Sequence, residues 1–427
     1  MTHRLRAIAI GRTLFLALPA LTSYAAAQTL TTLYTFTGGG DGAGPGTVAI
    51  DPAGVLYGTT GTAGAAGYGT AFALTPPVSS GGPWTGSFYS FPGGEEATPS
   101  GGSLAIADAG TLLFGAGAYI DSGNQGTVYV LSPPESPDGS WAERILYEFT
   151  GAPGDGHSPN SVIAATGHTG VPVLYGTTLF GGGGSLGFGT VFSLVPPSTP
   201  GDWTETVLYR FQGPPNDGSE PTANVLLSRG GVFYGTTSAG GTNNSGTVYS
   251  LKAPSSAGGT WTETVLYNFP QAFSGCGAGP LIQAGARGVL YGVASSCGHG
   301  HDNQGWVYSL TPPASPGGEW TPELLHQFTG GSTDGENPNS LVEYNGVLYG
   351  TTGVPNDGQV GTGYGTIFSL TPPGSPGGSW TETVLYFFTD GSDGGKPTGI
   401  VAGPGGVLYG ATSTGGSGFG TVFSFTP

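Results

Sequence analysis

The side chains best suited to chemistry gather near residue 300 of the 427-residue chain, in the segment Cys297-Gly298-His299-Gly300-His301-Asp302. Imidazole and carboxylate groups are common ligands of Zn²⁺, and a histidine can act as a general base near neutral pH. His299, His301 and Asp302 are therefore candidate metal ligands, and His299 and His301 are also candidate catalytic residues. The alternative is that a His-x-His pair in a glycine-rich loop belongs to the solvated surface.

The chain has two cysteines, Cys276 and Cys297. Two cysteines in an exported protein are expected to form a disulfide. Because the start of the chain indicates export, as argued below, we expect Cys276 and Cys297 to be bonded to each other. Free thiols and metal ligation are the alternatives.

A second group of candidates is a carboxylate that recurs four residues before a proline, usually in the pattern Asp-Gly-x-x-Pro. The six carboxylates at this position are Asp41, Glu95, Asp155, Asp217, Asp334 and Asp393, and Cys276 takes the seventh place. Gathered around one opening, they could bind Ca²⁺ or a cationic ligand, because hard cations take oxygen ligands. The alternative is a turn in which the aspartate accepts backbone N–H bonds.

Glu95 is followed directly by Glu96, and two adjacent carboxyl groups can share a proton. Glu95 is therefore a third catalytic candidate, with plain surface charge as the alternative. The chain contains neither the HExxH motif of zinc proteases nor a CxxC pair. The motifs in the sequence therefore indicate no specific reaction.

These candidates lie within units that repeat along the chain. The string GVLYGTT occurs at Gly54–Thr60 and Gly346–Thr352, GTVFSL at Gly189–Leu194 and WTETVLY at Trp203–Tyr209. Close variants of each string, and a proline followed by an apolar stretch, occur seven times at intervals of about 59 residues. Each is a short run rich in Val, Leu, Tyr, Phe and Thr between Gly and Pro, which predicts a strand.

The composition agrees with an all-β protein. The chain has 85 Gly and 35 Pro, and both residues are unfavourable inside helices. Aromatic residues make up 11% and charged residues 8%, whereas disordered chains are poor in aromatics and rich in charge. Four strands per unit and seven units predict a seven-bladed β-propeller with four antiparallel strands per blade. A parallel β-solenoid is the main alternative, although its coils are normally much shorter.

The strand order within a blade can also be predicted. The Pro-led strand should be innermost, followed by the VLYGTT strand, the GTVFSL strand and the Trp-led strand. The chain then starts with an outermost strand at Leu30–Phe36 and ends with a third strand at Thr421–Phe425. We therefore expect the N-terminal strand to close the last blade, because the seam of the ring is an edge that must be protected.

Six of the seven tryptophans recur at the start of the predicted outermost strand. They are Trp84, Trp141, Trp203, Trp261, Trp320 and Trp380. We expect them to cover blade edges and pack on neighbouring blades, with stacking on a carbohydrate as the alternative.

The combination of LYGTT, GTVFSLTPP, GGxW and TVLYxF resembles the GloVer tandem repeat of secreted bacterial "choice-of-anchor" proteins. The resemblance extends over nearly all of residues 28–427 and implies an extracellular location and no known reaction. Members of that family often carry a C-terminal sorting tail, whereas this sequence ends at Pro427 after its last strand. We therefore expect release into the periplasm or medium. The strand pattern is also similar to the NHL and quinoprotein propellers.

Residues 1–27 are typical of a secretory signal peptide. Arg4, Arg6 and Arg12 precede an apolar run at Leu14–Leu21, and Ala25-Ala26-Ala27 fits a cleavage site. The mature domain would then be residues 28–427, and its formal charge would change from −17 to about −20. So acidic a protein is not expected to bind nucleic acid or anionic lipid. No membrane span is expected, and we expect a monomer.

Two sets of loops should share one face of the propeller: those between blades, and those joining second and third strands. Long loops on one side of a regular scaffold usually carry binding sites. The sequence therefore favours an exported, non-catalytic binding or scaffold module for an extracellular glycan, protein or cation. The alternative is a polysaccharide lyase or hydrolase with its site at the channel mouth. A quinoprotein-like dehydrogenase rests only on the resemblance of the repeats.

Overall fold

The computed structural model describes residues 28–427 apart from short internal segments. The segments left out are 80, 94–97, 100–103, 108–109, 119–124, 135–138, 152–153, 166–170, 184–186, 200, 223–224, 257, 271–277, 286, 296–303, 316, 332, 355–362 and 376. The predicted signal peptide, residues 1–27, also lies outside the described residues and stays a prediction. No described helix has the length and apolar character needed to cross a bilayer.

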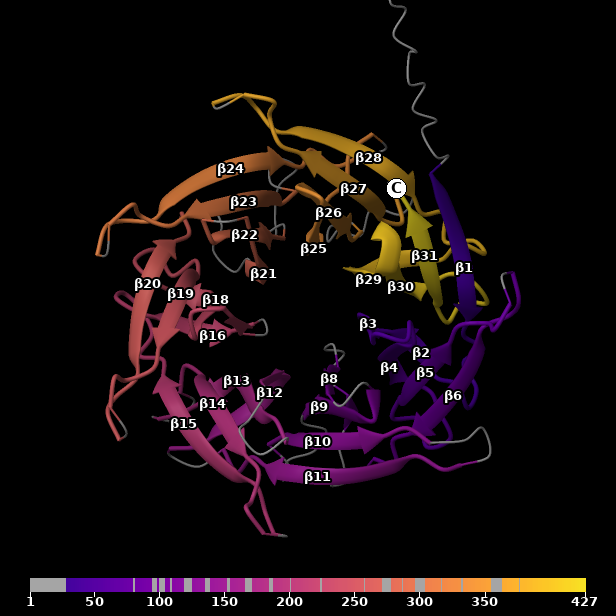
Figure 1. Cartoon of the computed structure of the whole chain (residues 1–427), viewed down its shortest axis with the longest axis horizontal. Coiled ribbons are helices and arrows are strands. Elements are labelled where there is room, and N and C mark those ends of the chain that lie inside the picture. The colour runs from indigo at the N-terminus through magenta and orange to yellow at the C-terminus, as the bar shows by residue number, and fades with distance from the viewer. Residues whose placement is uncertain are drawn as a thin grey trace, which may run out of the picture.

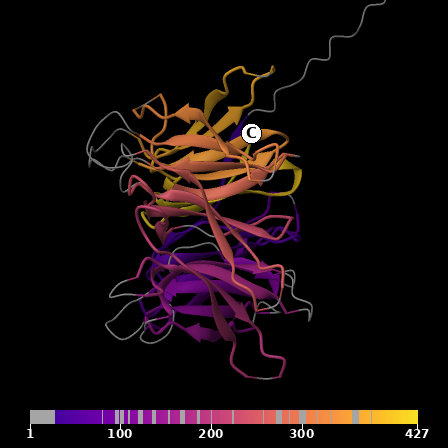
Figure 2. The same ribbon diagram turned by 90° about the vertical axis from the view of Figure 1, so that its left-hand side faces the viewer.

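Seven antiparallel sheets form a ring, which confirms the predicted seven-bladed β-propeller (Figure 1). Figure 2 shows the same ring from its side. In blade 3 the strand order is β12-β13-β14-β15 from the centre outward, and the other blades follow the same plan. The Pro-led strand is therefore innermost and the Trp-led strand outermost, as the repeats predicted.

The first three blades are built from residues 43–210. Blade 1 contains β2 (Ala43–Pro45), β3 (Ala49–Ile50), β4 (Leu56–Thr62), β5 (Thr70–Thr75) and β6 (Thr85–Ser90). Blade 2 contains β7 (Thr98–Pro99), β8 (Ala105–Ala107), β9 (Leu112–Ala118), β10 (Thr127–Ser132) and β11 (Ala142–Glu148). Blade 3 contains β12 (Gly156–Ala165), β13 (Val173–Gly181), β14 (Thr190–Val195) and β15 (Thr204–Arg210).

The remaining four blades complete the ring. Blade 4 contains β16 (Gly218–Pro221), β17 (Leu226–Leu227), β18 (Val232–Gly240), β19 (Thr247–Lys252) and β20 (Thr262–Asn268). Blade 5 contains β21 (Ala278–Ala284), β22 (Val289–Ala294), β23 (Trp306–Thr311) and β24 (Thr321–Gln327). Blade 6 contains β25 (Pro338–Tyr344), β26 (Val347–Thr352), β27 (Thr366–Thr371) and β28 (Thr381–Phe387). Blade 7 contains β29 (Gly395–Ala402), a 3₁₀ turn η3 (Pro404–Gly406), β30 (Leu408–Thr414), β31 (Thr421–Thr426) and β1 (Thr29–Thr35).

The innermost strands are less regular than a simple four-stranded plan. In blades 1, 2 and 4 the inner strand is split into two short pieces that pair with the same second strand. In blades 3, 6 and 7 it is continuous, but its register shifts just after the proline, for example between Pro159 and Ser161. Proline has no N–H to donate to the ladder, so the proline that begins each blade also interrupts its pairing.

The N-terminal strand closes the ring. β1 pairs with β31 in blade 7, from Thr29 opposite Thr426 to Thr35 opposite Thr421. Phe36, just after β1, is fully buried and packs edge-on against Phe72 of blade 1, with ring centroids 5.3 Å apart. The two ends of the chain thus share blade 7, as expected, and Phe36 links that blade to blade 1.

Neighbouring blades meet through a glycine at the start of the third strand. Gly189 has a φ of +91°, and a Cβ there would lie 2.6 Å from Cδ of Pro221 in the next blade. Only glycine fits both the backbone and the contact. The next residue, Thr190, places its hydroxyl oxygen 2.8 Å from that of Thr178, where both are buried. The Gly-Thr of one motif, the second Thr of LYGTT and the blade proline therefore form one interblade contact.

The repeated tryptophans pack against the preceding blade. Trp203 of blade 3 is only 7% exposed, and its ring lies 6.1 Å from that of Phe114 in blade 2. Trp141 of blade 2 donates from Nε1 to the hydroxyl of Ser87 in blade 1, at 2.8 Å. These tryptophans close the outer part of the interblade cores, as the packing interpretation predicted.

Candidate functional site

A cavity of about 610 Å³ opens among the innermost strands of the ring. It is lined by Gly44, Pro45, Gly46 and Thr47 of blade 1, Ser295 after blade 5's second strand, Asn337, Asn339, Gly353 and Val354 of blade 6, and Lys396, Pro397, Thr398 and Ser413 of blade 7. Figure 1 shows β25 and β29, which carry or adjoin the residues of blades 6 and 7, close to the centre of the ring. The cavity lies where innermost strands begin and second strands end, on the face predicted to carry binding loops.

Two residues of this cavity have a backbone conformation that residues other than glycine rarely adopt. Asn337 and Lys396 each have a φ of +55° and directly precede a blade proline. Ser158 and Glu220 occupy the equivalent positions of blades 3 and 4 with φ values of +56° and +57°. The N–H of Asn337 donates to the carbonyl of Gln304 in blade 5, at 2.8 Å, and the other three make the equivalent bond. The preceding blade thus holds each pre-proline residue in a strained conformation, and such strain clusters at functional sites.

The polar side chains around the cavity are fixed by hydrogen bonds between blades. Thr47 of blade 1 donates to the carbonyl of Thr398 in blade 7, at 2.8 Å. The Nδ2 group of Asn339 in blade 6 donates to the carbonyl of Pro397 in blade 7, at 2.7 Å. A hydroxyl that donates its single proton keeps lone pairs, and an amide that donates one proton keeps another. The cavity therefore presents acceptors and donors whose positions are set by the scaffold.

The predicted carboxylate ring occupies the turns between blades. Asp217 illustrates the arrangement: its Oδ2 accepts the Gln212 N–H at 2.7 Å and the Tyr209 hydroxyl at 2.8 Å. Its Oδ1 accepts the N–H of Gly218 at 2.6 Å. Tyr209 lies on the outermost strand of blade 3, so this carboxylate ties that strand to the start of blade 4.

The other four described aspartates of this set make the same kind of turn. Asp41, Asp155, Asp334 and Asp393 accept backbone or hydroxyl protons from Thr37, Thr150, Thr329 and Thr389, respectively. Burial alone would raise the pKa of Asp41, but hydrogen bonds from Thr37 and Tyr34 outweigh it and hold the pKa below its usual value. The geometry is that of the turn interpretation. Cation binding at this ring stays a prediction.

Six predicted site residues fall outside the part of the chain that the structure describes. They are Glu95, Cys276, Cys297, His299, His301 and Asp302. The disulfide, the histidine cluster and the catalytic role of Glu95 therefore stay predictions.

Sequence reasoning missed a glutamate near the start of the outermost strand, in the string WTETVLY. Glu205 and Glu263 reach into the interfaces between blades, and one carboxylate oxygen of each is buried without a hydrogen-bond partner. Burial, reinforced by the charge of Asp155 and offset by Arg210, raises the pKa of Glu205 to about 7. Burial and the charge of Asp217 raise the pKa of Glu263 to about 8. The sequence did carry a signal for these residues. The string WTETVLY places a glutamate at the same position of several outermost strands, where the side chain faces inward.

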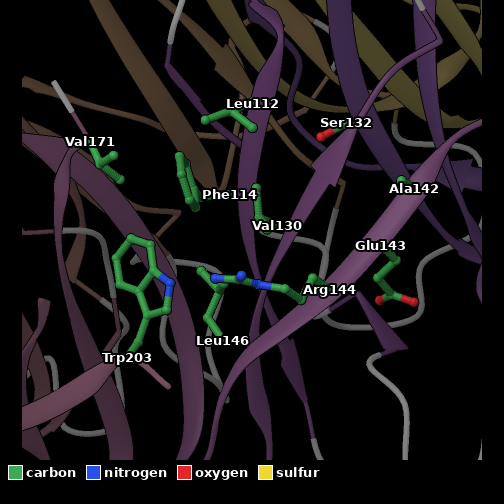
Figure 3. A pocket seen from close by; sticks show the side chains of 10 residues that line it. All are labelled: Leu112, Phe114, Val130, Ser132, Ala142, Glu143, Arg144, Leu146, Val171 and Trp203. Carbon is green, nitrogen blue, oxygen red and sulfur yellow. The ribbon is translucent and has the colours of Figure 1, made fainter. Parts of the chain in front are cut away.

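A second cavity, of about 310 Å³, lies between the outer strands of blade 2 and Trp203 of blade 3 (Figure 3). Its walls are mainly apolar and include Phe114, Val130 and Leu146. Figure 3 shows the side chain of Arg144 extending across it toward the indole of Trp203. Because that indole is buried in the interblade core, this cavity is a gap in packing and less suited to a polar ligand than the central one.

The family model described as the Gloeobacter/Verrucomicrobia repeat matches residues 142–362, just over half of the chain. No curated protein matches the chain.

Several solved structures have a similar fold. The PQQ-bound aldose sugar dehydrogenase from Streptomyces coelicolor is 10% identical with a TM-score of 0.47, over 93% of this chain and 98% of that one. The periplasmic gluconolactonase PpgL from Pseudomonas aeruginosa is 16% identical with a TM-score of 0.48, over 80% and 84%. The β-propeller domain of the Trilobed protease from Pyrococcus furiosus is 8% identical with a TM-score of 0.45, over 90% and 93%.

Proposed function

The chain belongs to the Gloeobacter/Verrucomicrobia repeat family, and we propose that it is an exported propeller that binds an extracellular glycan at its central cavity without catalysing a reaction. The observation that carries this proposal is the lining of the 610 Å³ cavity by hydroxyl and amide groups held between blades. Its volume lies within the usual range for ligand sites, about 300–1,000 Å³.

The chemistry of the lining suits sugar hydroxyl groups. Thr47 has already given its proton to a backbone carbonyl, so its hydroxyl oxygen can accept a proton from a ligand. Asn339 keeps one amide proton that a sugar oxygen can accept. A ligand whose groups both donate and accept matches such a surface, and because the surface is rigid, little entropy is lost on binding.

Lys396 points to an acidic glycan as the preferred ligand. The chain has only two lysines, Lys252 and Lys396, and an overall formal charge of −17. A cation at the cavity of so acidic a protein gives a local attraction for a ligand carboxylate, such as that of a uronic acid.

Binding is favoured over hydrolysis by the types of residue present. Glycoside hydrolysis generally requires a pair of carboxyl groups across the scissile bond. The described residues that line the cavity include neither a carboxylate nor a histidine. We further propose that the protein acts outside the cytoplasm, in the periplasm or the medium, as the predicted signal peptide indicates.

A glycan array with acidic and neutral oligosaccharides, followed by calorimetry, tests the proposal. Lys396→Gln should weaken binding of an oligouronate by about tenfold or more, since a charge-assisted hydrogen bond contributes about 1.5–3 kcal/mol. Lys252→Gln is the matched control, because Lys252 is exposed at the end of β19 and does not line the cavity. Equal affinities of the Lys396→Gln variant and the wild type would disprove the role of Lys396. Turnover of the bound glycan would contradict the non-catalytic assignment.

A further inference from the structure

A group of three side chains recurs where one blade meets the next. At the interface of blades 3 and 4 it consists of Tyr209 on β15, Asp217 in the turn and Glu263 on β20. The tyrosine hydroxyl donates to Asp217, and the charge of Asp217 acts on Glu263. Tyrosine, aspartate and glutamate also meet at blades 2 and 3, where the charge of Asp155 acts on Glu205 and both charges act on Tyr147.

The interface of blades 5 and 6 carries a histidine in place of the tyrosine. His326 on β24 stands where the other described outer strands have tyrosine, and its Nε2 lies 3.4 Å from Oδ1 of Asp334. Glu382 on β28 is the third member. One ligand atom from each of the three residues lies within 4.8 Å of the others, which makes them the one such His, Cys, Asp or Glu group among the described residues.

This exchange of one residue changes what the group can bind. A neutral tyrosine uses its hydroxyl proton to satisfy the aspartate, as Tyr209 does. A neutral histidine carries its proton on one ring nitrogen and a lone pair on the other; in the tautomer with the proton on Nδ1, the Nε2 of His326 offers the lone pair that is the usual metal ligand. Burial raises the pKa of Tyr209 above its ordinary value, reinforced by the hydrogen bond to Asp217, so that tyrosine stays protonated and does not ligate.

The two carboxylates differ in their hydrogen bonds. Asp334 is oriented by the N–H and hydroxyl of Thr329, at 2.8 and 2.9 Å, and by the N–H of Gly335 at 2.8 Å. Glu382 has a buried oxygen, Oε1, with no hydrogen-bond partner. A buried carboxylate oxygen without a partner is costly, and a bound cation would remove that cost.

We propose that His326, Asp334 and Glu382 form a divalent metal site that binds Zn²⁺ between blades 5 and 6. Ligand atoms about 2.1 Å from a tetrahedral zinc ion lie about 3.4 Å apart, so side chains now within 4.8 Å need only a small contraction. One nitrogen and two oxygen donors suit zinc better than calcium, which takes six to eight oxygen ligands. Three protein ligands leave a fourth position open to water or to a ligand group.

The test compares the chelator-treated mature protein with His326→Tyr, which installs the residue found at the equivalent position of other blades and should fold normally. Wild type should bind one more equivalent of Zn²⁺ than the variant by calorimetry, and should give a Co²⁺ absorption band that the variant lacks. Glu382→Gln should weaken binding of this equivalent by about tenfold or more. Tyr209→His should create a second site, because Asp217 and Glu263 already stand beside that position.

Equal zinc stoichiometry and affinity in wild type and His326→Tyr would overturn the proposal, and any zinc bound would then belong to other residues. A His326→Tyr variant that changes only the melting temperature would show that His326 and Asp334 are an ion pair alone. Glycan binding at the central cavity is measured separately, so its outcome does not affect this test.

Discussion

The glutamates at the blade interfaces predict that the propeller loses stability as the pH rises. In the unfolded chain a glutamate ionises near pH 4.5, whereas in the folded chain Glu263 keeps its proton until about pH 8. Between these values the folded state binds one proton more than the unfolded state, so the free energy of unfolding falls with increasing pH. Below pH 4.5 both states are protonated, and the full contribution is present.

The size of the effect follows from the same values. At about 1.4 kcal/mol per pH unit, a rise from 4.5 to about 8 corresponds to about 5 kcal/mol for a fully buried group. Glu263 is part-buried, so solvent screening reduces the expected contribution to about 2 kcal/mol. Glu205, which titrates near pH 7, adds a smaller contribution of the same sign.

Urea unfolding at pH 5, 7 and 9 measures this effect. Glu263→Gln imitates the protonated side chain at every pH, so it should match the wild type at pH 5 and exceed it at pH 9 by about 2 kcal/mol. Glu319→Gln, at an exposed position, controls for the general loss of one negative charge. A wild-type stability that does not change between pH 5 and 9, or an unchanged slope in Glu263→Gln, would refute the reasoning.

Three further predictions concern the construction of the ring. Phe36→Ala should lower the free energy of unfolding by about 3–5 kcal/mol, because Phe36 is fully buried at the seam; a small loss in urea unfolding would mean that the seam contributes little. Gly189→Ala should destabilise far more than Gly231→Ala, since both have positive φ but only Gly189 meets a neighbouring blade; equal melting temperatures would contradict the close contact. Asp217→Ala should cost about 2–3 kcal/mol with or without calcium, because it leaves turn N–H groups unpaired. A rise in melting temperature at millimolar calcium that Asp217→Ala abolishes would instead establish the predicted cation site.

The number of blades, the order of strands within a blade and the closure of the ring could be predicted because they follow from the number and order of the repeated strings. The same strings return seven times, and the phase of the first and last strings places both ends of the chain in one blade. The inner strands were predicted less well. The sequence shows the prolines, but the bulge after Pro159 depends on how the two strands pair around a missing N–H.

The candidate sites were harder to predict because they depend on contacts between blades. Asp217 and Glu263 are separated by 46 residues, and nothing in their spacing shows that the charge of one acts on the other. His326 looks like an ordinary variant of WTETVLY until the turn brings Asp334 beside it. The central cavity likewise takes residues from four repeats.

The construction of the ring separates structural from functional positions. The glycine at the start of each third strand has a structural role, as the contact of Gly189 with Pro221 illustrates. The residue before each proline is held in one backbone conformation by a bond from its own N–H, which does not involve the side chain. At this position the repeats carry Ser158, Glu220 and Lys396, which differ in charge although their φ values are within 2°. Because the backbone is fixed without the side chain, the scaffold can change its ligand by substitution at these positions, and we expect the specificity of the central cavity to be determined there.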